Sequence, residues 1–181
     1  MRFILLDQIV AVHPGQKIEA VKNLTVAEEY LADHFPLFPV MPGVLMLEAM
    51  TQAGAWLIRA SENFAHSMVV LKEARNVKYA DFVRPGQKLV VSAEMLSESA
   101  AEVTLKTQGT VDGRVSVSAR LILTRYNQAD QNPRLARSDA LLRQRLREQY
   151  GLLYRADDAP GPADSESSPA PAQTSSPAAA R

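Results

Sequence analysis

The 181-residue chain contains no cysteine, which excludes disulfide bonds, thiol nucleophiles and cysteine-based metal sites. It also lacks an excess of either charge: 20 lysines and arginines balance 20 aspartates and glutamates, so the basic footprint typical of nucleic-acid-binding proteins is missing. No uncharged apolar run approaches the ~18 residues of a membrane span. The apolar start, residues 3–12, is broken by Asp7 and Gln8 and lacks the marks of a signal peptide. We therefore expect an intracellular protein located in the cytoplasm.

Composition divides the chain into three segments, enough for one ordinary domain with an appendage. Residues 1–127 combine apolar periodicities with turn signals and are predicted to form the folded domain. Residues 128–155 are arginine-rich and have a helical pattern. Residues 156–181 consist mainly of proline, alanine, serine and aspartate without a large apolar side chain. Such a segment cannot offset the entropy lost on ordering, so we expect it to be disordered.

The folded segment contains both strand-like and helical patterns. Several stretches show apolar residues at every second position, as in a strand with one buried face. Strands are expected over residues 3–12, 17–24, 68–77, 89–95, 103–107 and 115–123. Asp112-Gly113, between the last two stretches, is typical of a two-residue hairpin turn. Residues 44–60 are apolar on nearly every side, which predicts a long buried helix. The sequence thus predicts an α+β fold in which an antiparallel sheet wraps around that helix.

Glu48 is the residue of the predicted helix that a purely structural role explains least. Its neighbours are apolar, and an unpaired carboxylate in such surroundings is costly and has a raised pKa. Gln52 lies four residues further on, on the same helix face. Three interpretations follow: Glu48 is an acid/base group, it pairs with a structural arginine, or this end of the helix is exposed to solvent.

Two further candidate site residues are located near the start of the predicted helix, one before it and one at its first position. His34 precedes three prolines within seven residues, and a stiff loop can hold an imidazole in place for proton transfer. A lone histidine is also a common structural residue. Gly43 begins the helix, so its N–H points outward with the positive end of the helix dipole and can stabilise charge on a carbonyl oxygen. The alternative for Gly43 is a simple turn glycine. No two histidines have metal-ligand spacing, so no metal site is expected.

These residues share one motif. Residues 34–52, HFPLFPVMPGVLMLEAMTQ, resemble the signature of the bacterial 3-hydroxyacyl-acyl-carrier-protein dehydratases of the FabZ type, roughly G-H-F-P-x-x-P-x-M-P-G-V-L-x-x-E-A-x-A-Q. The resemblance covers roughly residues 3–125 and continues through Lys78-Tyr79, Arg84-Pro85-Gly86 and Val111-Asp112-Gly113. It implies a hotdog fold, with His34 and Glu48 as the catalytic pair. It also places Gly43 and Gln52 at substrate-binding positions.

The motif departs from the family pattern at three positions. Asp33 stands where the family usually has glycine, and Leu37 and Phe38 replace the usual glycine and basic residue. These departures leave the acyl specificity open. The acid is glutamate rather than aspartate, which by resemblance favours the dehydratase branch over the FabA-like dehydratase/isomerase branch.

By this resemblance the reaction is the dehydration of a (3R)-3-hydroxyacyl thioester on acyl carrier protein to the trans-2-enoyl thioester, as in fatty acid biosynthesis. No cofactor is implied. The family also implies a homodimer, or a higher assembly of dimers, whose site uses His34 of one protomer and Glu48 of the partner subunit. The alternatives are a hotdog acyl thioesterase and a catalytically impaired acyl-carrier-binding subunit.

The arginine-rich segment, 128–155, has two interpretations. Leu142, Leu146 and Leu153, with Gln149 or Tyr150, form a one-sided stripe that favours a helix packed on the domain as a brace. Its basic residues favour instead a docking surface for the acidic carrier protein: Arg134, Arg137, Arg143, Arg145, Arg147 and Arg155. We favour the brace, because apolar stripes usually bury against a partner surface.

Overall fold

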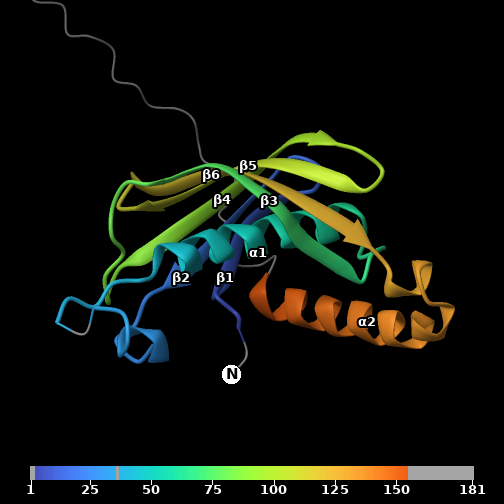
Figure 1. Ribbon diagram of the computed structural model, residues 1–181, viewed down its shortest axis with the longest axis horizontal. Helices are drawn as coiled ribbons and strands as arrows, with labels where there is room; N and C mark the ends of the chain where they lie inside the picture. Colours follow the sequence, from blue (N-terminus) through green and yellow to red (C-terminus); the bar gives the residue numbers. More distant parts are fainter. Residues whose placement is uncertain (1–2, 36, 155–181) are drawn as a thin grey trace, which may run out of the picture.

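The computed structural model describes residues 3–35 and 37–154. Figure 1 shows an arched sheet with one long helix on its concave side and a second helix below it. The strands are β1 (Gln8–His13), β2 (Lys17–Asn23), β3 (Met68–Tyr79), β4 (Lys88–Glu98), β5 (Glu102–Val111) and β6 (Arg114–Tyr126). The helices are α1 (Gly43–Ser61) and α2 (Ala136–Leu153), with short 3-10 helices at Glu29–Leu31, Gln128–Asp130 and Pro133–Leu135.

The six strands form one antiparallel sheet in the order β1-β2-β4-β5-β6-β3. α1 packs against its inner face, where the core residues are apolar. Gly54 permits this close packing, because a Cβ atom there would collide with Cδ1 of Leu105 on β5. The predicted helix over 44–60 and the α+β hotdog fold are confirmed.

The hairpin between β5 and β6 is also as predicted. Asp112 and Gly113 form its turn with φ angles of +50° and +76°. Two positive φ angles are what a type I′ turn requires, and its twist matches that of the flanking strands. The local sequence therefore determines this connection.

The N-terminal prediction is wrong for residues 3–7, because β1 begins only at Gln8. The preceding segment is bound to a helix side chain instead of lying in a strand. The backbone N–H of Leu5 donates to Oε1 of Gln52 (3.0 Å), and Nε2 of Gln52 donates to the carbonyl oxygen of Phe3 (3.1 Å). Leu5 and Leu6 are both buried, so their apolar pattern reflects contact with the core rather than strand pairing.

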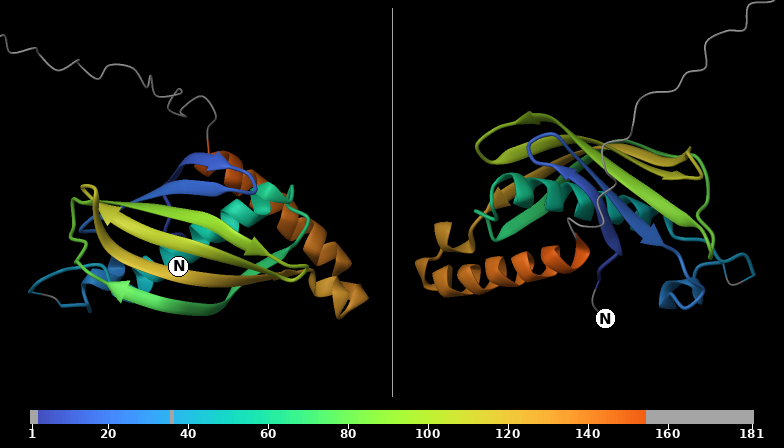
Figure 2. Two further views of the ribbon diagram at one scale, coloured as in Figure 1. Left: turned by 90° about the horizontal axis from the view of Figure 1, so that it is seen from above. Right: turned by 180° about the vertical axis from the view of Figure 1, so that it is seen from behind.

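α2 packs below the C-terminal half of α1, as two further views show (Figure 2). The ring of Tyr150 lies 6.0 Å from that of Trp56 on α1 and 5.6 Å from that of Phe64, measured between centroids. Leu153, at the end of α2, is buried in the same core. These contacts join the helix to the domain.

A buried carboxylate fixes the other end of α2. Asp139 accepts hydrogen bonds from Oγ of Ser67 (2.5 Å) and from the backbone N–H groups of Gln128 (3.2 Å) and Ala129 (2.8 Å). The hydrogen bond from Ser67, followed by the two backbone bonds, lowers the pKa of Asp139 below its ordinary value. This role is not evident from the sequence alone, where Asp139 is one of a few acids among many arginines.

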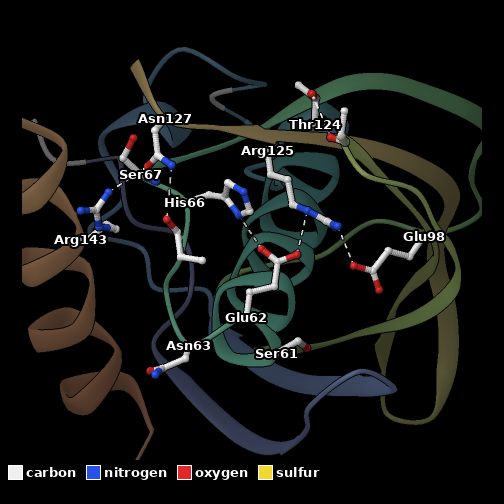
Figure 3. Close-up of polar contacts among 12 residues, drawn as sticks. Ser61, Glu62, Asn63, His66, Ser67, Glu98, Thr124, Arg125, Asn127 and Arg143 are labelled. Carbon is white, nitrogen blue, oxygen red and sulfur yellow. Dashed lines mark hydrogen bonds and ion pairs between the residues drawn. The ribbon is translucent and has the colours of Figure 1, made fainter. Parts of the chain in front are cut away.

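Neighbouring polar groups extend this network, as Figure 3 shows. Oδ1 of Asn127 accepts from the backbone N–H of Ser67 (3.0 Å) and from Arg143 of α2 (2.9 Å). Beside it, the buried Arg125 lies between Glu62 (2.8 Å) and Glu98 (2.6 Å). The end of α1, the sheet and the start of α2 are therefore held together by hydrogen bonds and ion pairs.

No helix within the described ranges is both long and apolar enough to cross a membrane. The tail predicted to be disordered, 156–181, lies outside the described residues.

Candidate active site

The first turn of α1 borders a pocket of about 600 Å³. The loop before the helix contributes His34 and Phe35, and the helix itself contributes Gly43 and Met46. The end of β3 and the loop after it close the pocket, mainly through Tyr79 and Phe82. Its lining is mostly apolar, with a few polar groups. Such a pocket suits an acyl chain, and its polar groups can face the reacting atoms.

Within the described residues, the ring of His34 makes one hydrogen bond. Its Nδ1 atom lies 3.0 Å from the carbonyl oxygen of Val40. A carbonyl oxygen only accepts, so in the neutral ring the proton is on Nδ1 and the lone pair is on Nε2. This arrangement leaves Nε2 as the proton acceptor, which is the form that a general base needs.

The residue after His34 adopts an unusual backbone conformation. Phe35 has a φ of +53°, in the left-handed region that non-glycine residues rarely occupy. The ring of Phe35 meets that of His34 edge-on, with centroids 4.5 Å apart. The backbone N–H of Phe38 donates to the carbonyl oxygen of Phe35 (2.7 Å) and closes this turn. The turn therefore places an aromatic ring directly against the imidazole.

Gly43 provides a donor at the same pocket. It is the first residue of a 19-residue helix, and none of the hydrogen bonds among the described residues uses its N–H. A Cβ atom at this position would lie 2.9 Å from Cε1 of Tyr79, so a larger residue would require that ring or the helix start to shift. The N–H, at the positive end of the helix dipole, can therefore donate to a bound carbonyl oxygen.

Glu48 lines a different hollow, of about 430 Å³. Its Oε1 atom accepts from Nε2 of Gln52 (2.9 Å), and no lysine or arginine of the described chain forms an ion pair with it. The structural arginine considered as its partner is thus not observed among the described residues. Five residues turn the helix by ~500°, which directs Glu48 to another side of α1 than Gly43.

The structure therefore groups the predicted site residues in two sets. His34 and Gly43 line one pocket, while Glu48 and Gln52 line the other. Within one chain the proposed catalytic pair is not brought into a common pocket. Gln52 has an additional role that the sequence did not predict, because it links Glu48 to the segment at Phe3 and Leu5.

The departures from the family motif lie outside the lining of the first pocket but next to it in the chain. Leu37 is fully exposed, whereas Phe38 packs edge-on against Phe82 with centroids 5.8 Å apart. The guanidinium carbon of Arg84 lies 4.9 Å from the centre of the Phe38 ring. Asp33 is exposed, and its carboxylate makes no ion pair in the described ranges. At the position of the family's basic residue, this chain therefore has an aromatic ring that contacts Phe82 and Arg84.

Sequence reasoning missed two residues of the second hollow, Arg59 and Gln149. Arg59 lies eleven residues beyond Glu48, which is about three helical turns and returns to the same face. That spacing was a usable signal in the sequence. Gln149 comes from α2, and its proximity follows only from the packing of that helix.

Comparison with known proteins identifies the fold family. Residues 1–120 match the family model described as FabA-like domain. The chain is 33% identical over 119 residues to the 3-hydroxyacyl-[acyl-carrier-protein] dehydratase FabZ of Ruminiclostridium cellulolyticum, covering 66% of this chain and 84% of that protein. It is 37% identical over 127 residues to the FabZ dehydratase of Nitrosospira multiformis, covering 67% and 85%.

Solved structures with the same fold are more distant in sequence. The dehydratase heterocomplex ApeI:P from Xenorhabdus doucetiae aligns with a TM-score of 0.59 at 19% identity, covering 74% of this chain and 90% of the other. A mutant of thioesterase PA1618 from Pseudomonas aeruginosa aligns with a TM-score of 0.52 at 14% identity, covering 64% and 78%. At these identities the structural likeness establishes the fold alone.

Proposed function

This chain belongs to the family of FabA-like domains, and from that premise we propose that it dehydrates a 3-hydroxyacyl thioester carried on acyl carrier protein. The product is the trans-2-enoyl thioester, and the enzyme is a hydro-lyase that acts in fatty acid biosynthesis or on related acyl chains. The similarity to proteins named as FabZ dehydratases supports this reaction. The observation that carries it is the apolar pocket in which the oriented imidazole of His34 and the free N–H of Gly43 lie together.

The elimination needs a base, an acid and a donor to the thioester carbonyl. In the proposal, Nε2 of His34 takes the proton from C2, and the N–H of Gly43 donates to the carbonyl oxygen as negative charge develops there. The C3–O bond breaks as Glu48 protonates the departing hydroxyl, which leaves as water. The C2–C3 double bond forms from the electron pair of the broken C2–H bond. Return of the proton from His34 to Glu48 completes the cycle.

Two subunits would complete this site. Since His34 and Glu48 line separate pockets of one chain, the proposed site combines His34 of one protomer with Glu48 of the partner subunit. β3 supports a homodimer, because it lies at the sheet edge, where unpaired backbone groups can continue the sheet into a second copy. Exposed apolar side chains lie on and near this edge, among them Leu71, Tyr79 and Phe82. The cytoplasmic location and any assembly beyond the dimer stay predictions.

One assay distinguishes the proposal from the two alternatives. The protein is incubated with a 3-hydroxyacyl carrier protein, and both the conjugated enoyl thioester and free carrier thiol are measured. Dehydration gives the enoyl product without thiol. Release of thiol without enoyl product would instead identify a thioesterase, and binding of the carrier with neither product would identify an impaired subunit.

A further inference from the structure

The hollow that contains Glu48 is a groove along one face of α1. Its floor is formed by Glu48, Gln52, Trp56 and Arg59, which are spaced by four, four and three residues and therefore lie in one row. Residues 69–71 of β3 form part of its wall. The groove thus leads from the proposed acid at one end to an arginine at the other.

Arg59 is a partly buried cation for which the described part of the chain provides no acidic partner. No carboxylate of the described residues lies within ion-pair distance of it, and its Nε atom is buried without a hydrogen-bond acceptor. Its guanidinium carbon lies 5.3 Å from the centre of the Trp56 ring. Burial lowers the pKa of Arg59 to about 10, so the group is still charged near neutral pH. A desolvated guanidinium is costly unless an anion or several acceptors reach it.

The extension after the family domain contributes to this end of the groove. The FabA-like match ends at residue 120, whereas Gln149 lies on α2 and lines the groove together with Arg59. Its amide offers hydrogen-bond donors beside the guanidinium. α2 is held there by the contact of Tyr150 with Trp56 and by the buried Leu153. The far end is therefore polar, although the residues between it and Glu48 are largely apolar.

We propose that Arg59 and Gln149 bind the terminal group of the acyl chain and select substrates that end in a carboxylate rather than a methyl group. A guanidinium fork matches a carboxylate through two parallel hydrogen bonds. Eleven residues of helix separate Glu48 from Arg59 by ~16 Å along the axis, and Arg59 reaches back toward Trp56. That span fits an extended chain on the order of ten carbons. This inference rests on the proposed dehydratase function.

The test compares two ten-carbon 3-hydroxyacyl carrier-protein substrates that differ only in a terminal carboxylate or methyl group. For the wild type we expect kcat/KM to favour the carboxylate. Arg59→Met keeps the length of the side chain but removes its charge, and should lower that preference roughly tenfold or more. Gln149→Leu should lower it by a smaller factor. Arg145→Met alters an exposed arginine of α2 and serves as the matched control, with the preference unchanged.

A binding measurement separates this inference from the proposed reaction. Calorimetry compares two ten-carbon acyl pantetheine amides, one ending in a carboxylate and the other in a methyl group, on the wild type and on Arg59→Met, and needs no turnover. Tighter binding of the carboxylate-ended amide that is lost in the variant supports the terminal site even if no dehydration is detected. A wild-type preference for the methyl-ended substrate, equal binding of both amides by the wild type, or dissociation of the assembly in Arg59→Met during size-exclusion chromatography would overturn it.

Discussion

Nδ1 of His34 lies 3.0 Å from the carbonyl oxygen of Val40, six residues further along the chain. This contact sets the tautomer of the neutral ring, because the carbonyl group has no proton to give. It also connects the proposed base to the backbone next to Met41. The backbone N–H of Met41 donates to the carbonyl oxygen of Val83 (2.8 Å). The imidazole is therefore anchored to the folded domain and not only to its own loop.

Replacing the proposed base should stop the reaction without unfolding the protein. We expect His34→Ala to lower kcat by roughly a hundredfold or more, as loss of a positioned acid/base group typically does. His13→Ala is the control, since His13 is exposed at the end of β1. Steady-state kinetics and thermal melting measure the two effects. Near wild-type turnover in His34→Ala would contradict the assignment.

Complementation between two inactive variants tests the shared site. His34→Ala and Glu48→Gln should each be inactive as homodimers. After subunit exchange, half of the dimers are mixed and each contains one intact site, so activity should recover to about a quarter of wild type. Mass spectrometry of tagged subunits verifies the exchange. If mixed dimers form and stay inactive, the pair does not combine across the interface.

Gly43→Ala should displace the N–H that is proposed to bind the substrate carbonyl oxygen, because the added methyl group contacts Tyr79. The new methyl group would meet the Tyr79 ring at 2.9 Å, so either the ring or the first turn of α1 must shift. We expect kcat to fall roughly tenfold or more, because the N–H then points away from its acceptor. Adding Tyr79→Leu gives the methyl group room and should restore part of the loss. Unchanged kcat in Gly43→Ala would argue against a role for this N–H.

Asp139 should make the attachment of α2 depend on pH. Its hydrogen bonds lower its pKa below the ordinary 3.8, so its stabilisation is complete above that value and disappears as the pH falls through the lower, folded-state pKa. Asp139→Asn should reduce the melting temperature at neutral pH, and the difference from wild type should shrink in acid. Glu94→Gln, on an exposed position of β4, is the control. Equal melting curves at neutral pH would contradict this account.

Truncation tests whether α2 acts as a brace or as a docking surface. Deleting residues 156–181 should change neither stability nor turnover, because that sequence has no large apolar residue to bury. Deleting 128–181 exposes Trp56 and Phe64, which pack against Tyr150, and should lower stability and activity on carrier-bound and small thioesters alike. A higher KM for the carrier-bound substrate alone, at unchanged stability, would favour carrier docking instead.

Local sequence was sufficient for much of the fold. Alternation of period two predicts the strands of the second half, and Asp112-Gly113 predicts their hairpin, because these features depend on residues close together in the chain. The apolar run before Ser61 likewise predicts a buried helix, since no face of it suits water. The family motif named His34, Gly43, Glu48 and Gln52 as site residues, and those roles stay predictions.

Contacts between distant segments decided the rest. Residues 3–7 have a strand-like pattern, but the backbone of the first of them is hydrogen-bonded to the side chain of Gln52, about 47 residues away, and regular pairing with β2 begins only at Gln8. The sequence around Asp139 suggests a surface acid. In the fold, its carboxylate accepts a hydrogen bond from Ser67, which lies 72 residues earlier in the chain. Arg59 and Gln149 line the same hollow only because α2 folds back onto α1 (Figure 2). Periodicity predicts which face of a helix or strand is buried. Which residues pack against that face depends on the folding of the whole chain.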